Sequence, residues 1–295
     1  MSNPMTEAVE VLRGNVKVVS LTDGTSGQAL GVVSLSHGLG RLGGDSVQNG
    51  LSLLCPDWLS PSDVGRITQI TQVAPVPLPV CRSSDPYFVK FLLSEYWRRG
   101  DADTVVLYLD YDHVVRTPLR LPNVEPGTVL VSSEVHPLME VDGADSLDRR
   151  VRLAFAELHH NTSFIMGTRT DLRRVASAWG AAYTNLMMVS HRYREELAFS
   201  LAAAQVGVSI FPVDLSVQSQ WSAFQNCGSL FHYGGSTISA SSAKRTLAAI
   251  ERGLGPHCAR DEIEAARMAF TSQIEACIAG AVRADGAANF ASEWA

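Results

Sequence analysis

Apolar residues follow two different patterns along this chain. Runs rich in β-branched and apolar residues, which predict strands, cover 15–21, 104–109, 128–132, 162–166 and 208–211. Prolines interrupt the stretch 51–80, where we expect several short strands. Apolar residues at helical spacing cover 26–42, 85–100, 146–158, 171–179 and 194–206, with Gly100 and Gly207 as stops. Because strands and helices alternate, the sequence predicts the α/β class, with a mainly parallel mixed sheet flanked by helices.

The same pattern predicts the domain organisation. No clear linker, internal repeat or low-complexity tract divides the 295 residues, which are enough for a sizeable core. We expect one main domain over residues 1–240, followed by a helical C-terminal extension over residues 241–295.

The composition is that of an ordinary folded protein, with 46% hydrophobic and 18% charged residues. The formal net charge of −6 argues against a nucleic-acid binder, because phosphate contacts need a basic surface. No apolar run reaches the roughly 18 residues that a membrane span needs, and residues 1–10 do not resemble a signal peptide. Five scattered cysteines without C-x-x-C spacing predict reduced thiols, so we expect a cytoplasmic protein.

The feature that points to chemistry is the end of the apolar run 104–109. Asp110 and Asp112 follow this run, and residues two apart on an extended backbone point the same way. Open α/β sheets bind their ligands at the carboxyl ends of strands. Two carboxylates that converge there suit Mg²⁺ or Mn²⁺, and such a metal suits a diphosphate.

The segment 106–115, with the sequence Val-Leu-Tyr-Leu-Asp-Tyr-Asp-His-Val-Val, resembles the metal-binding segment of GT-A-fold glycosyltransferases. It is most similar to the group of glycogenin and the bacterial galactosyltransferases, whose typical text reads vLYLDaDtvv. Further motifs of that group follow in the expected order at 18–24, 161–167, 194–199 and 230–235. The resemblance covers about residues 16–235, and its specificity lies in the ordered set of short motifs.

The resemblance implies a fold and an activity. The expected fold is GT-A-like, with residues 1–240 as the catalytic domain that binds a nucleotide sugar. The expected activity is transfer of a sugar from a nucleotide diphosphate sugar, with UDP as the expected carrier, to the hydroxyl of an unidentified acceptor. Residues 241–295 are expected to cover the acceptor or to form a homodimer interface.

The resemblance also assigns roles to individual residues. The metal ligands are expected to be Asp110, Asp112 and His232, a mixed oxygen and nitrogen set that suits Mn²⁺ somewhat better than Mg²⁺. The expected nucleotide contacts are Leu21, Thr22, Asp23, Lys90 and Tyr111. The donor sugar is expected to contact Asn161, Thr162 and Ser163, and the diphosphate Tyr233 and Gly234. The expected catalytic residues are Glu195 and Glu196.

Glu195 and Glu196 open a predicted helix, where acidic residues also interact favourably with the helix dipole. A carboxylate there can act as a base on the acceptor hydroxyl if the sugar configuration inverts, or stabilise developing positive charge if it is retained. We expect only one of the two to face the site, because adjacent helical residues diverge by about 100°.

The chain departs from the family pattern in three places. Residues 236–239 follow the histidine motif where the family often has Lys-Pro-Trp, and the nearest lysine is Lys244. His113 stands where a small residue is usual. No tyrosine follows Asp23, although the family often has one there.

Four alternative functions remain to be compared with glycosyl transfer. A nucleotidyltransferase needs a basic glycine-rich loop after the first strand, whereas residues 23–27 contain no Lys or Arg. A catalytically inactive protein would bind the nucleotide sugar with metal but transfer nothing. The G-x-G-x-x-G match at 38–43 suggests a dinucleotide site, but Asp57, near the expected position of its acid, does not follow a convincing strand. A phosphatase with the motif D-x-D-x-T needs threonine where this chain has Val114.

Overall fold

The computed structural model describes most of the chain between residues 16 and 232. The described residues are 16–23, 32, 35–36, 38–40, 42–43, 47, 50–62, 64–65, 73–83, 85–115, 117–133, 135–137, 158–187, 191–220 and 229–232. Most of the predicted helices 26–42 and 146–158 lie outside the described residues. So do Tyr233, Gly234, the predicted boundary near residue 240 and the extension 241–295.

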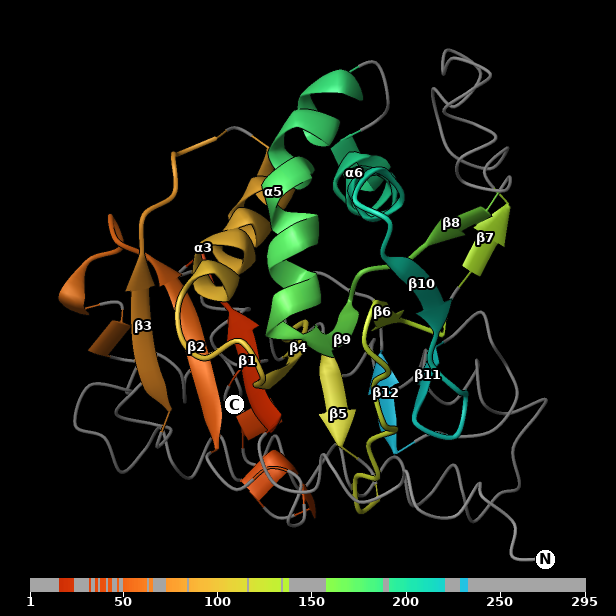
Figure 1. Cartoon of the computed structure of the whole chain (residues 1–295). Coiled ribbons are helices and arrows are strands. Elements are labelled where there is room, and N and C mark those ends of the chain that lie inside the picture. Colours follow the sequence, from red (N-terminus) through yellow and green to blue (C-terminus); the bar gives the residue numbers. More distant parts are fainter. Residues whose placement is uncertain are drawn as a thin grey trace, which may run out of the picture.

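A seven-stranded mixed sheet forms the centre of the described part (Figure 1). Its strands, in spatial order, are β10 (Ser209–Pro212), β6 (Thr128–Val131), β9 (Phe164–Thr168), β4 (Val105–Leu109), β1 (Val16–Leu21), β2 (Leu51–Pro56) and β3 (Ala74–Leu78). β9 runs antiparallel to its neighbours β4 and β6, and every other neighbouring pair is parallel. The predicted α/β class and mainly parallel mixed sheet are therefore confirmed.

Three helices, α3 (Leu92–Arg98), α5 (Arg169–Asn185) and α6 (His191–Gln205), lie on one face of this sheet (Figure 1). A short 3₁₀ helix, η2 (Pro86–Phe91), leads into α3, and the Asp85 side chain caps it by accepting from the Tyr87 amide at 2.9 Å. Gly207 follows α6 with φ of +67°, a left-handed conformation that glycine adopts without strain. The predicted stop at Gly207 is confirmed.

The alternation of side chains along β4 links the two hydrophobic cores of the domain. Val106 and Tyr108 pack on the helical side, in the cluster that contains Trp97 and Trp179. Val105, Leu107 and Leu109 pack on the opposite side. Because both faces are covered, every residue of β4 is buried, which explains its continuous apolar sequence.

Two small sheets lie beyond the central one. β5 (His113–Val115) pairs antiparallel with β12 (Leu230–His232), which pairs parallel with β11 (Gln218–Gln220). β7 (Val135–Pro137) pairs with β8 (Leu158–His160). The sequence did not predict these strands as separate elements, because three residues are too few to show a period. The pairing of β5 with β12 matters for the site, because it places β12 directly beside the chain that follows Asp112.

Three further expectations can be compared with the structure. β2 ends at Pro56, so Asp57 does follow a strand, contrary to our prediction. Gly38 and Gly40 are nevertheless helical, whereas a dinucleotide motif places its glycines in the turn between strand and helix. Neither Cys55, which is buried, nor Cys81, which is exposed, is in a disulfide. Among the described helices, none combines the length and apolar character needed to cross a membrane.

Candidate active site

The carboxyl end of β4 is tied directly to the chain before β9. The ladder between the two strands pairs Leu109 with Phe164, and beyond it the Asp110 amide donates to the Ser163 carbonyl at 2.8 Å. The motif at 161–163 is therefore held beside Asp110. After Asp110 the backbone turns through 111–112 into β5, so the two aspartates do not share an extended segment as predicted. The turn, rather than the pleat of a strand, brings Asp112 to the site.

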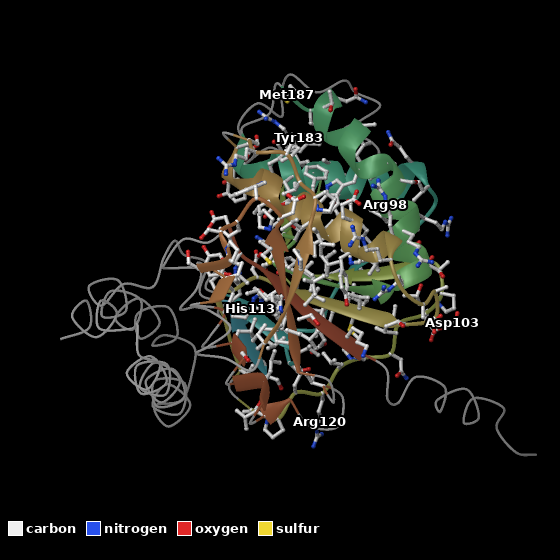
Figure 2. The ribbon with its side chains drawn as sticks, turned by 90° about the vertical axis from the view of Figure 1, so that its left-hand side faces the viewer. Arg98, Asp103, His113, Arg120, Tyr183 and Met187 are labelled. Carbon is white, nitrogen blue, oxygen red and sulfur yellow. The ribbon has the colours of Figure 1, made fainter. Side chains whose placement is uncertain are left out.

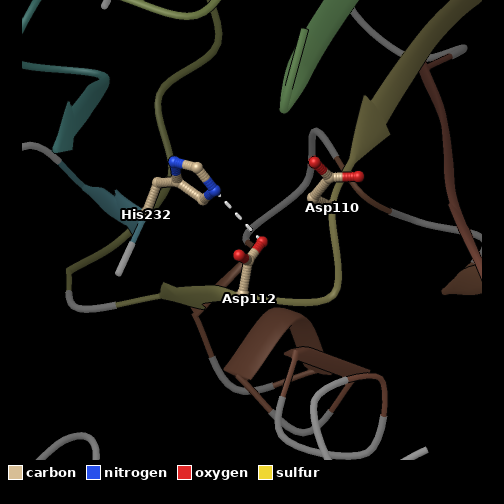
Figure 3. Close-up of side chains that lie close together, drawn as sticks. All are labelled: Asp110, Asp112 and His232. Carbon is tan, nitrogen blue, oxygen red and sulfur yellow. Dashed lines mark ion pairs between the residues drawn. The ribbon is translucent and has the colours of Figure 1, made fainter. Parts of the chain in front are cut away.

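Asp110, Asp112 and His232 come together as predicted (Figure 3). Each offers one ligand atom, and these three atoms lie within 4.8 Å of one another. Nε2 of His232 lies 3.1 Å from Oδ1 of Asp112, and both side chains are about nine-tenths buried. Register explains the approach, because His232 on β12 is the direct partner of His113, the residue after Asp112.

These three residues fit a six-coordinate divalent ion. With bonds of about 2.1 Å, neighbouring ligand atoms lie about 3.0 Å apart and opposite ones about 4.2 Å apart. The 3.1 Å between His232 and Asp112 matches two neighbouring positions. The ligand atom of Asp110 lies within 4.8 Å of the other two, and a rotation of its side chain can shorten that distance. The cluster could therefore bind a metal.

A buried lysine joins Asp110 to helix α6. Nζ of Lys90 lies 3.4 Å from Oδ2 of Asp110 and 3.2 Å from Oε2 of Glu195. It also donates a hydrogen bond to the Thr162 hydroxyl at 3.1 Å, and this hydroxyl lies 3.0 Å from both carboxylate oxygens of Glu195. The ammonium group of Lys90 is thus engaged inside the protein, and its contact with a nucleotide stays a prediction.

Negative charge exceeds positive charge in this cluster. Burial raises the pKa of Glu195 to about 7, with Glu196 and Asp110 adding to the rise and Lys90 opposing it. Burial likewise raises the pKa of Asp110, and the Asp112 carboxylate raises it further against the effect of Lys90. Burial disfavours the charged Lys90, but the surrounding carboxylates outweigh burial and raise its pKa. A divalent cation would offset the remaining negative charge.

Asn161 and Glu196 form the next layer of the site. The Asn161 side chain accepts from the Ser163 amide at 2.8 Å and donates to Oε1 of Glu196 at 3.1 Å. Glu195 and Glu196 both reach the segment 161–162, Glu195 through Thr162 and Glu196 through Asn161, one residue earlier. That only one of them faces the substrate stays a prediction. Both lie in the second turn of α6, which begins at His191 and not at the glutamates.

The predicted nucleotide residues other than Lys90 lie along the ends of β1 and β4. Leu21 ends β1, and the Thr22 amide donates to the Leu54 carbonyl at 3.1 Å. Leu21 and Thr22 have buried side chains, whereas Asp23 and Tyr111 are partly exposed. Burial raises the pKa of Tyr111, and the carboxylates of Asp112, Asp110 and Asp23 add to the rise.

Three residues of the site were not predicted to have a role. Tyr108 donates a hydrogen bond from its hydroxyl to Oδ1 of Asp110, and its position two residues earlier in β4 is a signal that could have found it. His113 lies in the interior, well away from Tyr183 and Met187 near the end of α5 (Figure 2). Burial, with His232 adding to the effect, lowers the pKa of His113 to about 3, so its imidazole is neutral. Gln218 bonds to His113, and no local pattern marks it.

No protein-family model matches the chain, and no curated protein matches its sequence. Solved structures do match its fold. The galactosyltransferase LgtC in complex with donor and acceptor sugar analogues is 12% identical, with a TM-score of 0.53 over 88% of this chain and 95% of that chain. An active-site mutant of LgtC has a TM-score of 0.52 over 75% of this chain and 88% of that chain, again at 12% identity. The apo form of the bifunctional glycosyltransferase WbbM is also 12% identical, with a TM-score of 0.54 over 90% of this chain and 52% of that chain.

At 12% identity these likenesses establish the fold. The chain has the GT-A-like architecture of these glycosyltransferases, as the resemblance at 106–115 predicted. Its aspartate pair lies at the carboxyl edge of the sheet, the edge where open α/β sheets bind ligands.

Proposed function

We propose that this protein is a metal-dependent glycosyltransferase that moves a sugar from a nucleotide diphosphate sugar to an acceptor hydroxyl. The observation that carries the proposal is the cluster of Asp110, Asp112 and His232 on this fold, beside two further buried carboxylates. LgtC, which has the same fold, was solved with analogues of a donor and an acceptor sugar. That complex supports the same pair of substrate classes here.

Asp110, Asp112 and His232 would hold the metal, which we propose to be Mn²⁺ or Mg²⁺. Their mixed oxygen and nitrogen donors favour Mn²⁺. When bound there, a divalent cation offsets the charge that develops on the departing diphosphate. The protein's own contribution is to hold both aspartates aimed at one point, through Tyr108 and Lys90 on Asp110 and His232 on Asp112.

The sugar would lie beside Asn161, whose amide offers both a donor and an acceptor for sugar hydroxyls. Glu196 accepts from this amide and is 9% exposed, whereas Glu195 is fully buried against Lys90 and Thr162. This difference in exposure supports Glu196 as the group that would act on the reacting centre, either as a base or by stabilising positive charge. Glu195 would instead hold Lys90 and Thr162. Together with the bond from the Ser163 amide to Asn161, these contacts would fix the segment that carries Asn161.

The nucleotide would lie over the ends of β1 and β4, where Asp23 and Tyr111 offer partly exposed polar groups. We propose UDP as the carrier and Tyr233 and Gly234 as its diphosphate contacts, both on the strength of the family resemblance. Leu21 and Thr22 would take part through their backbone groups, because their side chains are buried. Lys90 would act through Asp110 and Glu195, with which it already pairs.

The direct test is release of nucleoside diphosphate from a panel of nucleotide sugars, measured with Mn²⁺, with Mg²⁺ and with EDTA. We expect one donor to be cleaved or transferred with metal present, and no release with EDTA or in an Asp112→Asn variant. Metal-dependent binding of a donor without release would favour the inactive binding protein. Release in EDTA, or by Asp112→Asn, that equals release by the natural chain with metal would contradict the proposal.

A further inference from the structure

We propose that Gln218 and His113 are positioning residues for the metal ligands. In this arrangement the Gln218 amide fixes the imidazole of His113, which in turn holds the turn of Asp110 and Asp112 and orients His232. This inference rests on the proposed metal-dependent function. Neither residue would itself contact the metal or the donor.

Gln218 is fully buried, and its amide orientation follows from its partners. The Ser133 backbone amide, which can only donate, lies 2.9 Å from Oε1 of Gln218. The other end of the side chain, Nε2, therefore provides the donors. It lies 2.8 Å from Nε2 of His113 and 3.3 Å from the Ser163 hydroxyl. One amide thus joins the chain after β6, the chain before β9 and the first residue of β5.

The Gln218 bond decides which ring nitrogen of His113 carries the proton. Nε2 of His113 accepts from Gln218, so in the neutral ring the proton is on Nδ1. Nδ1 then donates to the carbonyl of Asp110 at 2.9 Å. This bond spans residues 110–113 and closes the turn that carries both aspartates. A small side chain after the second aspartate cannot make it.

The same imidazole also lies against the third ligand. The rings of His113 and His232 stack with centroids 4.8 Å apart and planes 22° apart. Because the two residues are direct partners between β5 and β12, the stack is fixed by strand register as well as by ring contact. A single side chain therefore touches the turn of the aspartates and the ring of the histidine ligand.

A buried glutamine and a buried histidine are costly unless their polar atoms are all paired. Here both ends of Gln218 and both ring nitrogens of His113 have partners. Leucine or valine would fill the same space without that requirement, but would not fix the direction of the turn. Partners of this kind behind metal ligands typically contribute about 10–100-fold to metal affinity.

The test is the dissociation constant of Mn²⁺ alone, measured from the electron paramagnetic resonance signal of the free ion. We expect Gln218→Met, which keeps side-chain length without a donor, to bind Mn²⁺ about 10–100-fold more weakly than the natural chain. Gln218→Glu should behave likewise, because a carboxylate oxygen replaces the donor to His113. His113→Asn, whose amide nitrogen can still donate to the Asp110 carbonyl, should bind with intermediate affinity.

Two controls separate positioning from general destabilisation. Gln205→Met makes the same change at an exposed position of α6, and Val175→Ala weakens the buried face of α5 without touching the site. Both should keep the Mn²⁺ affinity of the natural chain, although Val175→Ala should melt at a lower temperature. If Gln218→Met does not fold, the comparison uses Gln218→Glu and His113→Asn.

The outcomes distinguish this inference from the proposed function. If the natural chain binds Mn²⁺, Asp112→Asn does not, and the Gln218 and His113 variants bind as tightly as the natural chain, the positioning role is wrong and the metal site stands. If the natural chain and Asp112→Asn both fail to bind Mn²⁺, the metal site is wrong, and the positioning role is wrong with it.

Discussion

Removing the positive charge of Lys90 tests the electrostatic account of the site. Its ammonium lies 3.2 Å from Glu195 and 3.4 Å from Asp110, and the residue is 6% exposed. A Lys90→Met variant keeps most of the aliphatic chain and loses only the charge. Removing one partner from a buried ion pair costs about 3–5 kcal/mol of unfolding free energy, because the remaining charges lose their compensation.

The size of this loss should depend on pH through Glu195. Burial raises the pKa of Glu195 to about 7, from an ordinary value of 4.5. A carboxyl group whose pKa is raised on folding stabilises the folded state fully at a pH below its unfolded pKa, and this stabilisation is lost as the pH rises through its folded pKa. Without the Lys90 ammonium, the charged form of Glu195 is less favourable, so Glu195 stays protonated to a higher pH. We therefore expect the full loss at about pH 8 and a smaller loss at about pH 5.5.

Urea denaturation at the two pH values measures these free energies. Arg98→Met is the matched control, because Arg98 forms a partly exposed ion pair with Glu95 one helical turn away. Such pairs contribute about 0–1 kcal/mol. The account is refuted if Lys90→Met loses no more stability than Arg98→Met at about pH 8, or if its loss is larger at the lower pH.

Three further predictions follow from contacts at the site and in the helical core. Tyr108→Phe removes the hydrogen bond to Asp110 and should cost about 1.5–3 kcal/mol in urea denaturation, with weaker Mn²⁺ binding. Trp179→Ala, which empties a buried position stacked on Trp97, should cost about 3–5 kcal/mol in the same assay, and a loss below 1 kcal/mol would contradict the packing. Glu196→Gln should lower kcat about 100-fold or more while the KM for the donor changes little, and unchanged turnover would remove Glu196 from the reacting centre.

Much of the framework could be predicted because its signals are local. The apolar run of β4 and the aspartates after it are contiguous, and a buried parallel strand leaves just such a pattern. The same holds for α6, whose helical spacing and stop at Gly207 are both visible in the sequence. His232 was predicted only through the family motif, since nothing near it indicates a strand.

The parts that could not be predicted depend on contacts between distant residues. Gln218 meets His113 across 105 positions, and Lys90 meets Thr162 across 72. Each partner alone looks like an ordinary polar residue, and only the folded chain shows that both are buried. The turn after Asp110 was likewise missed, because β5 is stabilised by pairing with β12 and not by its own three residues.

The measurement that tests the central claim most directly is the melting temperature with UDP, with Mn²⁺, with both together and with both plus EDTA. A ligand at a hundred times its dissociation constant adds about 2.7 kcal/mol of stability. We predict that UDP stabilises the chain by about this free energy, seen as a rise in melting temperature, only when Mn²⁺ is present. We predict no such rise in Asp112→Asn. A UDP shift that survives EDTA and the Asp112→Asn substitution, or no shift with any nucleoside diphosphate, would contradict a metal-dependent nucleotide-sugar site at Asp110, Asp112 and His232.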